Sequence, residues 1–165
     1  MVTKLPPKYP YSKNRHSFED GLEFQDFVCD KMNTELGIAF TNFQSKKYQF
    51  GNGENRQGIE IKEDKGTTRT GNVSIEIAER VNINSDFVPS GIYRDDNSWL
   101  YIQGNFEVVY IFSKNILKLL HKDGRYKDEI PKEVPTIKRF LLPAKDARKF
   151  AAKVLEFKTQ TLLTG

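Results

Sequence analysis

Two short stretches, GIEIK at residues 58–62 and VSIEIA at residues 73–78, decide the fold class of this sequence. In both, isoleucine or valine alternates with a polar or small residue, which is the period of a β-strand with one apolar face. Each stretch also places one glutamate, Glu60 or Glu76, between two isoleucines. We therefore predict two neighbouring strands with buried apolar faces and with both carboxylates on the opposite, common face.

The segments around these strands alternate between helix and strand patterns. A helix is expected at 18–36, with Ser17 as its N-cap and Gly37 as a left-handed C-cap. A final helix is expected to open at Pro143, with an apolar stripe that reaches Val154. This order predicts an α/β (α+β) fold with a central mixed sheet flanked by helices. Further strands are predicted at 38–50, 99–103, 108–112 and 137–142, and a short helix at 113–124.

Size and composition indicate one folded domain. The chain has 165 residues, 38% of them hydrophobic, which suffices for a core without disulfides. We interpret residues 1–16, rich in Pro, Lys and Tyr, as an extended arm and residues 17–165 as one domain. The lone Cys29 favours a reducing compartment, so we expect a cytoplasmic protein without a membrane span. The net charge of +4 favours a polyanionic partner.

The two glutamates suggest metal chemistry. Carboxylates held close together repel each other unless a cation lies between them. Hard cations such as Mg²⁺ prefer oxygen ligands and activate water for attack on phosphate. Lys62 shares the strand face of Glu60, where an ammonium can stabilise developing negative charge. The alternative interpretation is a solvated sheet face on which Glu60, Lys62 and Glu76 only balance one another's charges.

Gly58-Ile59-Glu60, followed by Gly71-Asn72-Val73-Ser74-Ile75-Glu76, resembles the core of the PD-(D/E)XK nuclease superfamily, the restriction-endonuclease-like fold. That family places an acid on one strand and Glu-x-Lys on the next, and an upstream helix often adds a glutamate. The resemblance extends over residues 17–121, because the segments 90–92, 99–101 and 116–120 also resemble the layout after the core in small phage-type members. It implies a metal-dependent nuclease, a hydrolase that cuts phosphodiester bonds in DNA with Mg²⁺ or Mn²⁺.

The resemblance also implies a role for each matched residue. Glu60 and Glu76 would bind the metal, together with the carbonyl oxygen of Ile77. Lys62 would assist the attacking water or the transition state. Glu23 would match the glutamate of the upstream helix, where it would orient the site or bind a second metal.

Some assignments stay open at this point. Glu19 is an alternative to Glu23 as the helix glutamate. Basic residues flank the acidic strands and are candidates for phosphate contacts, although ordinary solvation of turns explains them equally well. These residues are Lys46, Lys47, Arg56 and Arg69.

The sequence departs from the family pattern two residues after Glu76, where Ala78 occupies the position of the expected lysine. Lys62, on the other strand, is the ammonium that we expect to replace it. A different registration treats Glu60-Ile61-Lys62 itself as Glu-x-Lys, and its nearest upstream acid is then Glu54. The missing lysine also supports an alternative function, a nucleic-acid-binding or assembly protein with the same fold and no catalysis. Oligomeric state, including a homodimer, stays open.

Overall fold

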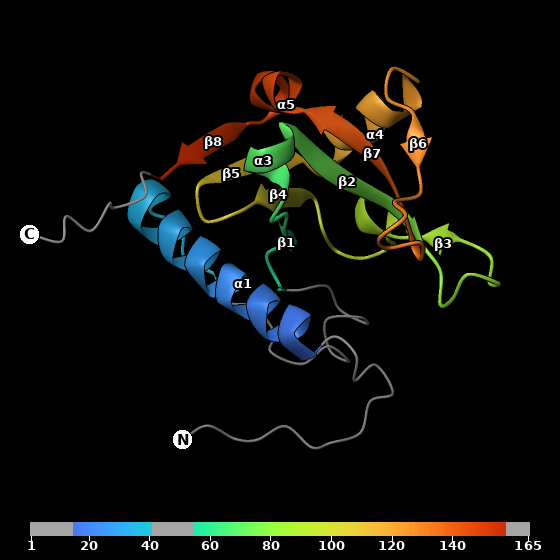
Figure 1. Ribbon diagram of the computed structural model, residues 1–165. Coiled ribbons are helices and arrows are strands. Elements are labelled where there is room, and N and C mark those ends of the chain that lie inside the picture. Colours follow the sequence, from blue (N-terminus) through green and yellow to red (C-terminus); the bar gives the residue numbers. More distant parts are fainter. Residues whose placement is uncertain (1–14, 41–54, 158–165) are drawn as a thin grey trace, which may run out of the picture.

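The computed structural model describes residues 15–40 and 55–157 of the chain. Helix α1 lies on one face of a four-stranded sheet, and a second four-stranded sheet lies on the other side (Figure 1). The described helices are α1 (Arg15–Leu36), α3 (Thr67–Thr70), α4 (Lys114–Lys122) and α5 (Ala144–Phe150), with one 3₁₀ turn, η2 (Gly91–Tyr93). The strands are β1 (Ile59–Glu63), β2 (Asn72–Glu79), β3 (Val88–Pro89), β4 (Leu100–Gly104), β5 (Val108–Ser113), β6 (Asp128–Glu129), β7 (Ile137–Pro143) and β8 (Lys153–Glu156).

The strands form two sheets instead of the single central sheet that we predicted. The first sheet has the order β1-β4-β5-β8 and is mixed, because β1 runs parallel to β4 while the other pairs are antiparallel. The second sheet has the order β3-β2-β7-β6 and is antiparallel throughout. This content of helices and strands confirms the predicted α+β class.

The predicted pairing of the two glutamate strands is wrong. Glu60 lies opposite Tyr101 in the parallel β1–β4 pair, whereas Glu76 lies opposite Arg139 in the antiparallel β2–β7 pair. The alternating pattern was nevertheless correct about strand faces, since Ile59 and Ile61 are buried on one side of β1. A period of two residues fixes which side chains share a face, but it does not specify the partner strand.

Helix α1 covers the isoleucine face of β1 with the apolar stripe Phe24, Val28 and Met32. It begins at Arg15, so Ser17 lies inside the helix and is not its N-cap. Residues 1–14 of the predicted arm lie outside the described residues. Gly37 confirms the predicted C-cap, because its φ is +67° and its N–H donates to the carbonyl of Asn33 at 3.0 Å.

The predicted final helix is too long. Helix α5 ends at Phe150, and Val154 lies in β8, which pairs with β5. Valine packs well on a sheet, so the apolar stripe at helical spacing did not exclude a strand at Val154.

Residues 38–40 form no strand, and the rest of the predicted 38–50 strand lies outside the described residues. No described helix is long and apolar enough to cross a bilayer.

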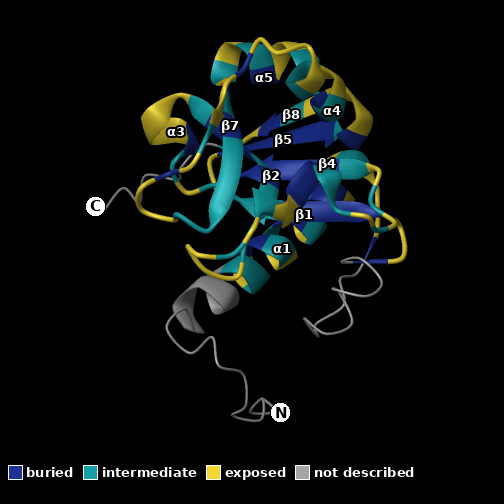
Figure 2. Cartoon of the chain, turned by 90° about the vertical axis from the view of Figure 1, so that its right-hand side faces the viewer, coloured by how far each residue is buried: buried dark blue, intermediate teal, exposed yellow. Residues whose placement is uncertain are grey.

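The core has two parts, one on each side of the first sheet. One part lies between α1 and the sheet, and the other lies between the two sheets, where α4 and α5 add Leu117 and Ala147. In Figure 2, β1, β4 and β5 are buried, whereas α3 and the outer side of α5 are exposed. Because Ile59 and Ile61 pack against α1, Glu60 and Lys62 lie on the other face of β1, where Glu60 is buried.

Candidate functional site

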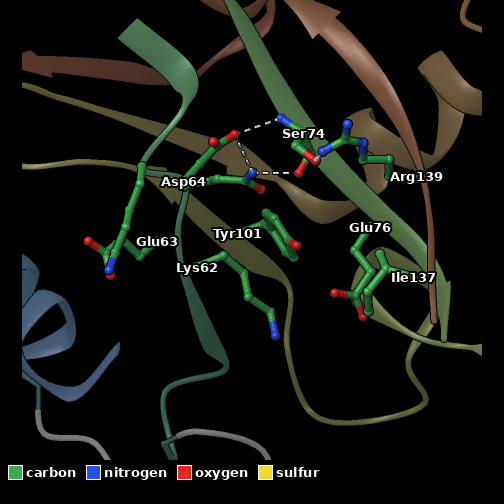
Figure 3. A pocket seen from close by; sticks show the side chains of 10 residues that line it. Lys62, Glu63, Asp64, Ser74, Glu76, Tyr101, Ile137 and Arg139 are labelled. Atoms are coloured by element: carbon green, nitrogen blue, oxygen red, sulfur yellow. Dashed lines mark hydrogen bonds between the residues drawn. The ribbon is translucent and has the colours of Figure 1, made fainter. Parts of the chain in front are cut away.

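The candidate site is a pocket of about 260 Å³ lined by residues of both sheets. Strand β1 contributes Lys62, β2 contributes Ser74 and Glu76, and β7 contributes Arg139. Figure 3 shows the ammonium of Lys62 and the carboxylate of Glu76 directed toward the same space, with the ring of Tyr101 between them. The two sheets thus bring together side chains that lie on separate strands.

Glu60 lies buried beside this pocket, with 3% of the residue exposed. One carboxylate oxygen, Oε1, is 3.3 Å from the Lys62 ammonium. The other, Oε2, is 3.4 Å from the Ser98 hydroxyl. A carboxylate removed from water is costly unless a positive charge and hydrogen bonds compensate it. Lys62 is therefore the immediate counter-ion of Glu60, and it extends from Glu60 into the pocket.

Glu76 is oriented by a turn that the sequence analysis did not identify. The fully buried Ser90 donates its hydroxyl hydrogen to Oε1 of Glu76 at 2.5 Å, and its N–H donates to the carbonyl of Ile77 at 3.2 Å. Gly91 follows with φ of +53°, and a Cβ there would lie only 2.2 Å from the carbonyl oxygen of Glu76. The register of β2 and β7 shifts between Glu76 and Ala78, a bulge of the kind that re-aims side chains at functional sites.

Arg94 links the two glutamate strands electrostatically. Its guanidinium donates to Oε1 of Glu79 at 3.1 Å. Burial alone would lower the pKa of Arg94, but the negative charges of Glu79, Glu60, Glu76 and Asp96 together raise it. Glu60 and Glu76 therefore act on one cation although they belong to different sheets.

Asp64 joins the end of β1 to the second sheet. Its Oδ2 accepts hydrogen bonds from the Ser74 N–H at 2.8 Å and from the Gln103 side chain at 3.2 Å (Figure 3). Its Oδ1 accepts the N–H of Gly66 at 3.2 Å. The carboxylate thus fixes the distance between the two sheets at the pocket. Asp64 follows the last residue of β1, and its polar sequence context gave no sign of this role.

Arg139 supplies a second fixed cation to the pocket. Its Nη1 donates to the hydroxyl of Ser74 at 3.0 Å, and its Nη2 lies 2.7 Å from Oε1 of Glu129. The Glu129 pair holds the guanidinium in place while part of it faces the pocket. A planar guanidinium in such a position suits a phosphate oxygen.

The other predicted residues do not join the site. Glu23 is exposed on α1, and that helix covers the face of β1 opposite to Glu60, so Glu23 does not line the pocket. The helix stripe buries Phe24, which turns the adjacent Glu23 toward solvent. Arg56 and Arg69 are exposed outside the pocket. Lys46, Lys47 and Glu54 lie outside the described residues, and the structure describes no side chain for Glu19.

Of the three predicted metal ligands, Glu76 lines the pocket and Glu60 lies buried beside it. The third, the carbonyl of Ile77, already accepts the N–H of Ser90 at 3.2 Å. Mg²⁺ commonly uses one or two carboxylates together with water and phosphate oxygens. Within residues 15–40 and 55–157, however, no group of three or more His, Cys, Asp or Glu side chains is arranged to hold a metal. An ion bound here would therefore keep several water or phosphate ligands.

Comparison of the chain with protein-family models, with curated proteins and with solved structures found no match. The function is therefore inferred from the residues around the pocket. These residues combine carboxylates that can hold a cation with an ammonium and a guanidinium that can hold a phosphate.

Proposed function

We propose that this protein is a metal-dependent nuclease that hydrolyses phosphodiester bonds in DNA. One observation carries the proposal: Lys62 and Glu76, from different sheets, line one pocket, and the buried carboxylate of Glu60 lies 3.3 Å from the Lys62 ammonium. The proposal keeps Glu60 on β1 as the first acid and Glu76 on β2 as the glutamate of the second motif of a restriction-endonuclease-like core, in an arrangement where these strands belong to different sheets. The basic net charge of +4 agrees with a polyanionic substrate.

In this proposal the residues have separate roles in metal binding, catalysis and phosphate binding. Glu60 and Glu76 would hold Mg²⁺ or Mn²⁺, and the carbonyl of Ile77 would add a ligand through the lone pair that Ser90 does not use. The bound ion supplies a water of lowered pKa and neutralises charge on the phosphate. Lys62 now compensates Glu60, and a divalent ion on that carboxylate would free its ammonium for a phosphate oxygen or the attacking water. Arg139 holds a second phosphate oxygen from the opposite side of the pocket.

A second candidate function is nucleic-acid binding without catalysis. Ala78 supports it, because the position has no ammonium and the lysine opposite, Lys138, directs its Nζ over the ring of Phe87 at 4.9 Å. Lys138 therefore does not replace the family lysine, and catalysis depends on Lys62. The two functions differ in whether DNA is cut, and they share the requirement for a phosphate-binding surface.

A cleavage assay separates the two functions. Linear, supercoiled and branched DNA are incubated with the full chain in Mg²⁺, in Mn²⁺ and in EDTA, with RNA of equal length as a second substrate. The nuclease proposal predicts metal-dependent cuts in at least one DNA form and none in EDTA. Binding of DNA with no cleavage in any metal would favour the non-catalytic function.

Replacing Lys62 by methionine should lower the cleavage rate by about 10²–10⁴-fold while metal binding persists. The change removes the ammonium but keeps the length of the side chain, so Glu60 loses its counter-ion and should bind Mn²⁺ at least as tightly as before. Single-turnover cleavage and Mn²⁺ titration measure the two effects. Lys127→Met, at an exposed position, is the matched control. A Lys62→Met variant that cuts at the parent rate would remove Lys62 from the mechanism.

A further inference from the structure

We propose that Lys114 is a positioning residue of the nuclease site, because it holds the loop 94–98 so that Ser98 meets Glu60 and Arg94 meets Glu79. The inference rests on the proposed function for its catalytic consequence. Lys114 is the first residue of α4 and does not line the pocket. Its influence on the site therefore passes through the loop.

The ammonium of Lys114 is buried and fully engaged. Only 3% of its side chain is exposed. Its Nζ donates to the carbonyl of Arg94 at 3.1 Å, to Oδ1 of Asp96 at 3.1 Å and to the hydroxyl of Ser98 at 2.6 Å. A lysine ammonium has three hydrogens, so all of them are used within a single loop.

Asp96 is the partner of Lys114 in the loop, and we call the Lys114–Asp96 ion pair with its hydrogen bonds to Arg94 and Ser98 the clamp. Its Oδ1 accepts the hydroxyl hydrogen of Ser98 at 2.5 Å and the N–H of Ser98 at 2.8 Å. Burial alone would raise the pKa of Asp96, but the hydrogen bonds from Ser98 and Lys114 lower it. Asp96 thus stays ionised at neutral pH, and the Lys114–Asp96 pair carries no net charge.

The loop held by the clamp contacts glutamates on both β1 and β2. The hydroxyl of Ser98 lies 3.4 Å from Oε2 of Glu60 on β1. The guanidinium of Arg94 lies 3.1 Å from Oε1 of Glu79 on β2. At its middle, Asn97 donates to the carbonyl of Asn55 at 2.7 Å, which docks the loop at the start of β1.

A buried ion pair is weak evidence for stability, because the cost of removing two charges from water offsets their attraction. An apolar pair of the same size would fill the same space. It would not, however, accept and donate the directed hydrogen bonds that fix Ser98 and Arg94. The clamp therefore determines where the loop groups lie, which is the property that a metal site requires of its surroundings.

The test uses the double variant Lys114→Met/Asp96→Asn, which removes both charges and leaves no buried ion unpaired. Trp99 is the single tryptophan of the chain; it follows Ser98 and donates its indole N–H to the carbonyl of Gln57 at 2.7 Å. Trp99 is largely exposed, so its fluorescence anisotropy, and not its access to a quencher, reports the order of the loop in EDTA. Ser98→Ala keeps the Lys114–Asp96 ion pair and removes the hydroxyl that contacts Glu60, Lys114 and Asp96. Lys122→Met, exposed at the end of α4, is the control.

We expect the fluorescence anisotropy of Trp99 to fall in the double variant and kcat to fall by about 10–100-fold with little change in KM. Ser98→Ala should lower kcat and change the anisotropy less than the double variant does, because the Lys114–Asp96 pair and the bond to the Arg94 carbonyl remain. A double variant with parent anisotropy, or one with a loosened loop and parent kcat, would overturn the inference. If the parent does not cut DNA, the proposed function fails, and unchanged Trp99 anisotropy in the double variant would then separately refute the clamp.

Discussion

Changing Glu76 to glutamine is expected to lower metal-dependent DNA cleavage by roughly a hundred-fold or more, and Glu60→Gln should do the same. Each change keeps the shape of the side chain but removes half of the negative charge that would hold the ion. Glutamine at position 76 can still accept the hydrogen bond from Ser90, so the turn beside it should keep its structure. Single-turnover rates at saturating Mg²⁺ measure the loss.

The matched control for these two variants is Glu133→Gln, because Glu133 is exposed between β6 and β7 and does not line the pocket. It should cleave at the parent rate. If Glu60→Gln or Glu76→Gln also cleaved at the parent rate, that glutamate would only balance the charge of Lys62 or Arg94, and the metal would have to bind elsewhere.

Gly91→Ala should destabilise the protein by roughly 2 kcal/mol or more and also impair the site. The residue has φ of +53°, and an added Cβ would lie 2.2 Å from the carbonyl oxygen and 2.8 Å from Cβ of Glu76. These are backbone and inner side-chain atoms, which cannot move without shifting β2. The turn must then move away, which separates Ser90 from the Glu76 carboxylate. Urea unfolding and cleavage kinetics test the two consequences.

Gly124→Ala separates backbone strain from steric contact. Gly124 has φ of +75°, but a Cβ there would meet nothing within 4 Å. Its substitution should cost about 1 kcal/mol from the left-handed conformation alone and should leave cleavage unchanged. Equal losses of stability in Gly91→Ala and Gly124→Ala would show that the close approach of Gly91 to Glu76 does not matter.

The sequence predicted strand faces better than strand partners. Alternation around Glu60 and Glu76 correctly placed both glutamates opposite the buried isoleucines, and Lys62 shares the face of Glu60 as expected. Their partners, β4 and β7, come from later in the chain, and hydrophobic alternation is the same for any partner. Sequence periodicity therefore could not show that two sheets face each other across the pocket.

The residues of the site that were not predicted come from irregular segments. Ser90, Arg94 and Ser98 lie between β3 and β4, where no period connects a side chain to a face. Lys114 begins a helix, where the sequence gives no sign of burial, because lysine is almost never fully buried unless it is paired. The only hint was the glycine after Ser90, because a buried serine–glycine pair suits a close backbone approach.

Thermal unfolding with and without Mn²⁺ tests most directly whether Glu60 and Glu76 bind one ion. An ion that binds only the folded state at a hundred times its Kd stabilises that state by about 2.7 kcal/mol. We predict that Mn²⁺ raises the Tm of the parent relative to EDTA and that Glu60→Gln and Glu76→Gln each abolish the rise. A parent Tm that does not respond to Mn²⁺ or Mg²⁺, or an undiminished rise in both variants, would contradict a metal site at these glutamates.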